Sequence, residues 1–210
     1  RELQPDFCSV TYGAGGSTQE RTVELVREIR ATGLETMAHL TCVSHTREEI
    51  GTLVEHFLAM GVENLLALRG DPPAGQREFA PPAGGFRYAS ELVRFIRERD
   101  HHLCIGGAGY PEGHVETPLR EDDLRHLKAK VDAGADYICT QMFFDNHVFY
   151  DWCERCELAG IKEPLVAGIM PINTIAGMKR MADLATGTNF PTRLQKHDYR
   201  CQNKHEAVKR

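Results

Sequence analysis

The chain has 210 residues, of which 41% are hydrophobic and 26% charged, a composition typical of a soluble globular domain. Its formal net charge of -5 disfavours nucleic acids and anionic membranes as partners. No apolar run approaches the roughly 20 residues of a membrane span, and the polar residues 1–6 contain no signal-peptide core.

Seven cysteines are an odd number for a disulfide framework, which indicates a reducing compartment and predicts a cytoplasmic protein. Four of them lie in or beside apolar runs and are expected to be small reduced core residues: Cys8, Cys42, Cys104 and Cys139. Cys153 and Cys156 form a C-x-x-C on a predicted helix. Because no second pair follows at zinc-ribbon spacing, structural zinc is not expected.

Strands and helices alternate along the chain. Short apolar runs predict six strands, over residues 7–11, 36–40, 64–68, 103–108, 137–140 and 165–169. Apolar stripes predict a helix after each strand: from Ser17 to Gly33, from Thr46 to Gly61, over 88–99, over 121–133, around 149–156 and over 174–184. Ser17 with Glu20, and Thr46 with Glu49, match capping boxes at the first two helix starts.

The alternation predicts an α/β fold built from six βα units. No linker or composition break interrupts residues 1–210, which indicates a single domain. Parallel strands with crossover helices form either a (β/α)8 barrel or a doubly wound open sheet. Six units are two short of a barrel, so counting alone leaves both folds open.

Each predicted strand ends in residues that can do chemistry. In α/β folds ligands bind at these carboxyl ends, where loops and helix N-termini meet. The strand ends read Thr11-Tyr12-Gly13-Ala14, His39-Leu40-Thr41-Cys42, Arg69-Gly70-Asp71, Tyr110-Pro111-Glu112-Gly113-His114, Thr140-Gln141-Met142-Phe143-Phe144 and Gly168-Ile169-Met170-Pro171. A ring of such residues on one face indicates a large ligand with a polar edge.

The first two strand ends also have purely structural interpretations. The glycine loop over residues 12–16 looks like a phosphate cradle, but Thr18 replaces the last glycine of G-x-G-x-x-G, and a tight turn explains the loop as well. His39 fits a structural histidine equally well. A metal site formed by His39, Cys42 and His45 would lack a carboxylate or fourth ligand.

Two later strand ends are also open to two interpretations. Arg69 and Asp71 fit an ion pair, or a site in which Gly70 lets a ligand approach the backbone. Gln141 beside Phe143 and Phe144 fits core packing, or a site that hydrogen-bonds and stacks a planar heterocycle.

Six segments in register over residues 5–184 carry a family resemblance: Ser9-Val10-Thr11-Tyr12-Gly13-Ala14, His39-Leu40-Thr41-Cys42, Leu66-Ala67-Leu68-Arg69-Gly70-Asp71-Pro72-Pro73, Gly109-Tyr110-Pro111-Glu112-Gly113-His114, Lys128-Ala129-Lys130-Val131-Asp132-Ala133-Gly134-Ala135 and Thr140-Gln141-Met142-Phe143-Phe144-Asp145. In order and spacing they resemble the methylenetetrahydrofolate reductase family. Each motif alone is weak, but six in register are highly specific.

The resemblance implies a (β/α)8 barrel with non-covalent FAD at the strand carboxyl ends. It implies these FAD-binding residues: Thr11, Tyr12, Ala14, His39, Arg69, Gly70, Asp71, Tyr88, Ala89, Tyr110, His114, Asp123 and Lys130. Asp71 matches the family carboxylate near the flavin N1 edge, where its charge favours hydride donation and can stabilise a cationic folate. Gln141 matches a pterin-binding residue, so Asp71 and Gln141 are the expected catalytic residues, and Gln141 and Phe143 the substrate contacts.

The implied reaction is ping-pong. NADH or NADPH reduces FAD and leaves, and 5,10-methylenetetrahydrofolate then accepts the hydride as an iminium ion to give 5-methyltetrahydrofolate. This would place the protein in one-carbon metabolism and methionine synthesis. The expected partners are methylenetetrahydrofolate and NAD(P)H, and a homo-oligomer is left open.

The sequence also departs from the family pattern. The family's first strand carries a general-acid glutamate in a stretch resembling F-E-F-F-P-P, which residues 1–210 do not contain. The last barrel strands are not found either, so we expect about six βα units of one catalytic barrel. Met181 stands where the family often has Phe. Two alternatives remain: an inactive remnant that binds flavin or a partner chain, and an unrelated, metal-dependent barrel lyase or hydrolase.

Overall fold

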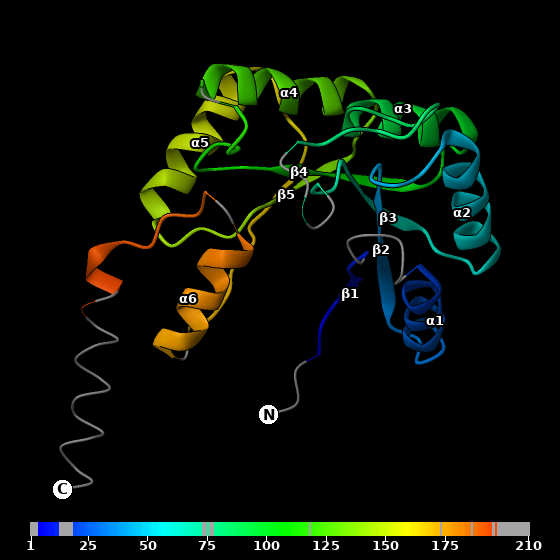
Figure 1. Cartoon of the computed structure of the whole chain (residues 1–210), viewed down its shortest axis with the longest axis horizontal. Coiled ribbons are helices and arrows are strands. Elements are labelled where there is room, and N and C mark those ends of the chain that lie inside the picture. The colour runs from blue at the N-terminus through cyan, green and yellow to red at the C-terminus, as the bar shows by residue number, and fades with distance from the viewer. Residues whose placement is uncertain are drawn as a thin grey trace, which may run out of the picture. The chain divides into compact units, whose positions relative to one another are not determined.

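The computed structural model describes residues 4–12, 19–72, 75, 78–117, 119–172, 174–185, 187–194 and 196. Over these residues each strand is followed by a helix (Figure 1). The elements are β1 (Phe7–Val10), α1 (Gln19–Arg30), β2 (Glu35–Thr41), α2 (Arg47–Ala59), β3 (Asn64–Leu68), α3 (Ala89–Arg99), β4 (Cys104–Gly109), α4 (Arg120–Asp132), β5 (Tyr137–Thr140), α5 (Asn146–Leu158), β6 (Leu165–Val166) and α6 (Ile175–Leu184).

The strand order distinguishes the two folds that the sequence left open. Hydrogen-bonded neighbours in the sheet follow the chain order β1-β2-β3-β4-β5-β6. A doubly wound sheet reverses its order at a switch point, whereas a (β/α)8 barrel adds each strand beside the previous one. The described part of the chain therefore has the winding of a partial (β/α)8 barrel, and the predicted α/β fold class is confirmed.

The first four strands are paired in parallel with a defined register. Val10 lies opposite Ala38, Thr41 opposite Leu68, and Asn64 opposite Cys104. Because the strands are parallel, their carboxyl ends lie at one edge of the sheet.

The chain divides into two compact units. Unit 1 comprises Arg1–Ala108 with Leu127–Ile138, and unit 2 comprises Gly109–His126 with Cys139–Arg210. The single domain expected over residues 1–210 stays a prediction.

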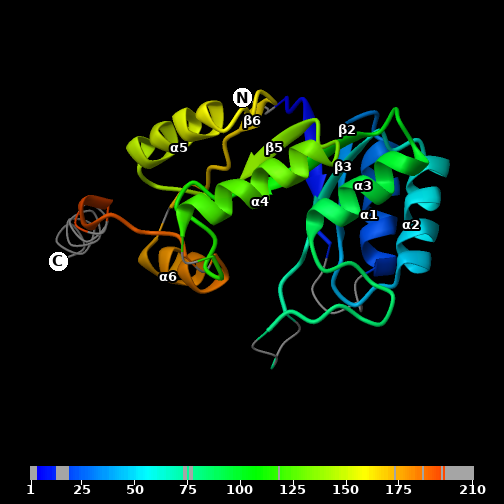
Figure 2. The same cartoon turned by 90° about the horizontal axis from the view of Figure 1, so that it is seen from above.

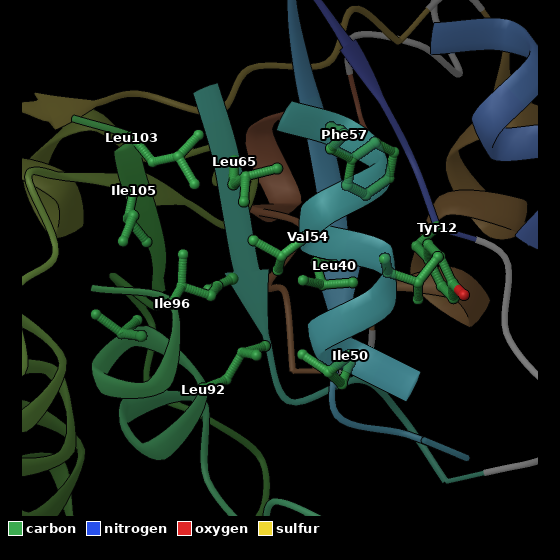
Figure 3. Close-up of a cluster of buried hydrophobic side chains, with 14 of the residues drawn as sticks. Tyr12, Leu40, Ile50, Val54, Phe57, Leu65, Leu92, Ile96, Leu103 and Ile105 are labelled. Atoms are coloured by element: carbon green, nitrogen blue, oxygen red, sulfur yellow. The ribbon is translucent and has the colours of Figure 1, made fainter. Parts of the chain in front are cut away.

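The core of unit 1 lies between the strands and helices α1, α2 and α3, which gather beside β2 and β3 (Figure 2). Ile50, Val54 and Phe57 of α2 project toward Leu40 and Leu65 of the strands (Figure 3). All five side chains are fully buried, and burial of each contributes about 1.5–3 kcal/mol before entropy is counted. Alternate residues of each strand point into this core, so the strands are buried as the sequence predicted.

The opposite face of the unit 1 strands holds a tyrosine that spans several strands. Tyr137 of β5 passes over Gly106 of β4, and its hydroxyl lies 2.6 Å from the Met37 sulfur and 3.3 Å from the Leu65 carbonyl oxygen. A Cβ at Gly106 would lie 2.4 Å from the tyrosine ring. Glycine at this position therefore makes room for the aromatic side chain.

At the amino edge of unit 1 an arginine joins α3 to two strands. Arg97 donates to the carbonyl oxygens of Leu103 and Gly134 at 2.8 Å each, and to Asp136 at 2.5 Å. The Asp136 carboxylate also accepts from the Ile105 backbone N–H at 2.7 Å. These bonds satisfy carbonyls at the ends of loops, which is a structural role.

Most predicted elements match the structure to within a few residues. The Thr46–Glu49 capping box is confirmed, with both reciprocal hydrogen bonds present. The expected Ser17 capping box cannot be compared, because Ser17 lies outside the described residues.

One strand prediction and part of the cysteine prediction were wrong. The strand expected over residues 165–169 is limited to β6, because the Gly168 N–H donates to the Thr140 hydroxyl and Ile169 is 80% exposed. All six cysteines of the described part of the chain are free, and Cys42 and Cys156 are buried. The other expected core cysteines are only half-buried: Cys8, Cys104 and Cys139. None of the helices described is long and apolar enough to cross a membrane.

Candidate functional site

The carboxyl edge of unit 1 brings together residues from three strands. Thr11 and Tyr12 follow β1, Thr41 ends β2, and Arg69 to Asp71 follow β3. The Cys42 N–H donates to the Leu68 carbonyl at 3.1 Å and continues the ladder to the end of both strands. The sequence prediction that these strand ends converge is met within this unit.

Gly70 has a conformation and a packing that only glycine fits. Its φ of 85° lies in the left-handed region, and an added Cβ would lie 2.8 Å from Cγ1 of Val43 and 3.2 Å from Cβ of Thr41. The β3 loop therefore passes directly against the end of β2. Asp71, the next residue, is exposed at this edge.

Arg69 is held beside the same loop. Its guanidinium lies 5.1 Å from the centroid of the Phe79 ring, and its Nε donates to the Gly70 carbonyl at 3.4 Å. Among the described residues, Arg69 and Asp71 form no ion pair with each other, so that interpretation of the sequence is wrong.

His39 is held by a neighbouring strand. Its Nε2 shares a hydrogen bond of 2.6 Å with the hydroxyl of Ser9 on β1. Burial lowers the pKa of His39 to about 4, so the ring is neutral near pH 7. A neutral imidazole has one donor and one acceptor nitrogen, and Ser9 occupies one of them.

Thr41 is the only buried side chain in the described part of the chain whose polar atom has no hydrogen-bond partner. It is 6% exposed and lies two residues beyond His39, on the same face of β2. Buried hydroxyls are nearly always paired, and an unpaired one calls for an explanation.

Tyr12 is turned inward. Its hydroxyl lies 2.8 Å from Nε2 of His45, and the two rings pack edge to face with centroids 5.5 Å apart. Burial and the charge of Glu49 raise the pKa of Tyr12 to about 12. Thr11 is exposed and its carbonyl accepts from the Thr22 hydroxyl. The flavin contacts expected of Thr11 and Tyr12 stay predictions.

Three more predicted cofactor residues belong to unit 1. Tyr88 is 44% exposed and occupies the N-cap position of α3 without a capping hydrogen bond from its side chain, and Ala89 is the first residue of that helix. Lys130 reaches from α4 to the carboxyl end of β4, where its Nζ donates to the Ala108 carbonyl at 2.5 Å. Ala14, also expected at the flavin, lies outside the described residues.

Unit 2 holds the remaining cofactor candidates. The rings of Tyr110 and His114 pack edge to face at 4.7 Å, and Nδ1 of His114 accepts from the Glu116 N–H at 3.1 Å. Tyr110 and Asp123 line the same small hollow, whose 20 Å³ holds about one water molecule. The walls of this hollow also include Arg120, Trp152 and Arg155.

The two predicted folate contacts, Gln141 and Phe143, differ in how far their side chains are engaged by the protein itself. The Oε1 of Gln141 accepts from the Met142 N–H at 2.9 Å. Because a backbone N–H can only donate, this bond identifies the Gln141 oxygen as the acceptor. The NH₂ group of the amide therefore points away from Met142 and can donate to another group. Phe143 is 5% exposed and stacks on Phe149, with centroids 4.6 Å apart and planes at 3°. Within unit 2 this ring is a packing residue, and its expected folate contact stays a prediction.

The structure therefore groups the predicted residues by unit. Unit 1 contains Thr11, Tyr12, His39, Arg69, Gly70, Asp71, Tyr88, Ala89 and Lys130; unit 2 contains Tyr110, His114, Asp123, Gln141 and Phe143. The sequence did not assign Ser9, Thr41 or His45 to the cofactor site, although Ser9 and Thr41 stand in segments that carry the family resemblance and His45 was weighed as a metal ligand. Within the described residues there is no cluster of three or more His, Cys, Asp or Glu able to hold a metal ion.

The chain is similar in sequence to named reductases. The family model described as methylenetetrahydrofolate reductase matches residues 1–210. A probable methylenetetrahydrofolate reductase (NADH) of Oryza sativa subsp. japonica is 41% identical over 98% of the chain. The 5,10-methylenetetrahydrofolate reductase of Escherichia coli (strain K12) is 39% identical over 90% of the chain. The chain spans 36% of the length of the rice relative and 62% of that of the bacterial one.

Solved structures share the fold at low sequence identity. An uncharacterized protein from Clostridium thermocellum, which binds two copies of 5-methyl-5,6,7,8-tetrahydrofolic acid, has a TM-score of 0.53 at 15% identity, covering 92% of this chain and 74% of its own. A phosphonopyruvate hydrolase in complex with oxalate and Mg²⁺ has a TM-score of 0.51 at 12% identity, covering 94% and 80%. At such identities the likeness concerns the fold alone. With the family model matched over all its residues, the chain belongs to the methylenetetrahydrofolate reductase family.

Proposed function

We propose that the protein reduces 5,10-methylenetetrahydrofolate to 5-methyltetrahydrofolate, with FAD as cofactor and NADH or NADPH as electron donor, in a ping-pong reaction. Such an enzyme would serve one-carbon metabolism and methionine synthesis in the cytoplasm. The observation that carries the proposal is the family match over residues 1–210.

The carboxyl edge of unit 1 fits a flavin cofactor by its chemistry. The buried Thr41 hydroxyl has no partner in the described part of the chain, and the backbone at Gly70 is free of a side chain. His39 is neutral and Arg69 is positively charged, so the edge offers hydrogen-bonding groups together with charge for a phosphate-bearing, planar ligand. Residues that would hold FAD in unit 1 are Thr11, His39, Arg69, Gly70, Tyr88, Ala89 and Lys130.

When bound, FAD would supply the relay of a hydride from NAD(P)H to the folate. Asp71 would act on the folate, because a carboxylate stabilises the cationic iminium form that accepts the hydride. Gln141, whose NH₂ group is directed by the bond to Met142, would donate to an acceptor atom of the pterin ring and orient it.

The visible absorption spectrum of the purified protein tests the proposal. A flavin spectrum that bleaches on anaerobic addition of NADH or NADPH, followed by formation of 5-methyltetrahydrofolate from added substrate, would support both half-reactions. Bleaching with no folate product would favour an inactive flavin-binding member of the family. A folded, colourless protein that cannot be reconstituted with FAD would reject the proposal.

A further inference from the structure

The face of β2 that points away from the helix-covered core changes from apolar to polar along its length. Side chains alternate along a strand, so Met37, His39 and Thr41 lie on one face while Ala38 and Leu40 enter the helix-covered core. Met37 is in contact with the Tyr137 hydroxyl, which fills the middle of this face. Beyond it, toward the carboxyl end, the residues become polar.

The Thr41 hydroxyl is the polar group that the fold leaves unsatisfied. It is buried, and no hydrogen-bond partner exists for it among the described residues. A buried unpaired hydroxyl destabilises the folded chain, because water no longer hydrates it and no protein group replaces the water. A valine would fill nearly the same volume at lower cost, so stability alone does not explain a threonine here.

The surroundings of Thr41 indicate where a partner would come from. Gly70 is so close that a Cβ there would lie 3.2 Å from Cβ of Thr41, so the β3 loop lies against the threonine without covering it by a side chain. On the same face, His39 bonds Ser9 through Nε2, and its Nδ1 has no partner among the described residues. Two hydrogen-bonding atoms, two residues apart on one strand face, are thus available at this edge.

We propose that Thr41 is a further cofactor-binding residue, whose hydroxyl forms a hydrogen bond with a polar atom of FAD bound at the carboxyl edge of β2. The inference rests on the proposed function, since FAD is the ligand assigned to this edge. It gives the threonine a role that the free chain lacks: the hydroxyl destabilises the FAD-free protein and stabilises the complex.

The test compares two valine substitutions on the same strand. Thr41→Val removes the unpaired hydroxyl. Thr36→Val is the matched control, because Thr36 is fully buried at the other end of β2 and its hydroxyl already donates to the Leu34 carbonyl at 3.1 Å. Each variant is purified, stripped of flavin, and measured for its melting temperature and for its FAD dissociation constant by flavin fluorescence.

Opposite effects are expected. Thr41→Val should keep or raise the melting temperature of the FAD-free protein and weaken FAD binding about tenfold. Thr36→Val should lower the melting temperature by about 2–4 °C and leave FAD affinity unchanged. Thr41→Ser, which keeps the hydroxyl, should bind FAD within about threefold of the natural protein.

Three results would overturn the inference. If the natural protein binds FAD and Thr41→Val binds it equally well, the hydroxyl makes no contact with the cofactor, while the proposed function stands. If Thr41→Val destabilises the FAD-free protein as much as Thr36→Val does, or fails to fold, the hydroxyl has a structural partner. If the folded natural protein binds no FAD, the proposed function fails, and this inference with it.

Discussion

Adding one methyl group at Gly106 should destabilise the protein through a single aromatic ring. In Gly106→Ala the new Cβ would lie 2.4 Å from two ring carbons of Tyr137, about 1 Å inside van der Waals contact, and 2.7 Å from its hydroxyl oxygen. The ring cannot retreat without giving up its contacts with the Met37 sulfur and the Leu65 carbonyl. The backbone at Gly106 does not require a positive φ, so the clash alone decides the outcome.

The magnitude follows from these contacts. Forcing an extra methyl group into a packed site costs about 1–3 kcal/mol, and loss of the hydrogen bond to Leu65 adds about 0.5–1.5 kcal/mol. We expect Gly106→Ala to lower the free energy of unfolding by about 2–4 kcal/mol. Urea unfolding followed by circular dichroism measures this difference as a shift of the midpoint at constant slope.

The adjacent glycine provides the control. A Cβ at Gly107 would lie 3.4 Å from Cδ1 of Ile138 and from Cδ of Lys130, which is an ordinary van der Waals distance. Gly107→Ala should therefore cost less than about 1 kcal/mol.

A double-mutant cycle with Tyr137→Ala then isolates the clash. With the ring removed, the change at Gly106 should alter stability by less than about 1 kcal/mol. Equal costs of Gly106→Ala with and without the ring would refute the reasoning, because the tyrosine would then not be the group that the methyl meets.

Two further predictions concern the candidate site. Asp71→Asn should retain FAD but slow hydride transfer to the folate about 10²-fold, with a smaller effect on reduction by NAD(P)H, because the carboxylate acts on the cationic substrate; stopped-flow absorbance separates the two steps, and equal slowing would remove Asp71 from the mechanism. The contribution of His39 to the free energy of unfolding should be fully present above about pH 6.5 and be lost as the pH drops toward about 4. Burial holds the pKa of His39 at about 4 against an ordinary 6.5, so the unfolded chain takes up the proton first. His45, whose pKa burial also lowers, acts in the same direction. Urea unfolding at stepped pH should show a shallower decline for His39→Gln, and an unchanged pH dependence in that variant would contradict the assignment.

Local signals in the sequence determined the elements and their order. The Thr46–Glu49 capping box and the apolar stripe of α2 lie within one or two helical turns, so neighbouring residues alone decide that helix. The same holds for β3 and β5, whose predicted bounds equal the observed ones. The parallel pairing brings the polar strand ends of unit 1 to one edge, as expected, because parallel strands must bring their carboxyl ends together. A ligand site at that edge stays a prediction.

Only the tertiary structure decided the strand order and the contacts between residues that are distant in the sequence. Counting six βα units left two folds open, and only the order of neighbouring strands distinguished them. Ser9 meets His39 across 30 residues, and Tyr137 meets Met37 across 100, through strand register that no local pattern specifies. The unpaired hydroxyl of Thr41 is likewise invisible in sequence, because a threonine is satisfied or unsatisfied only by what the folded chain places around it.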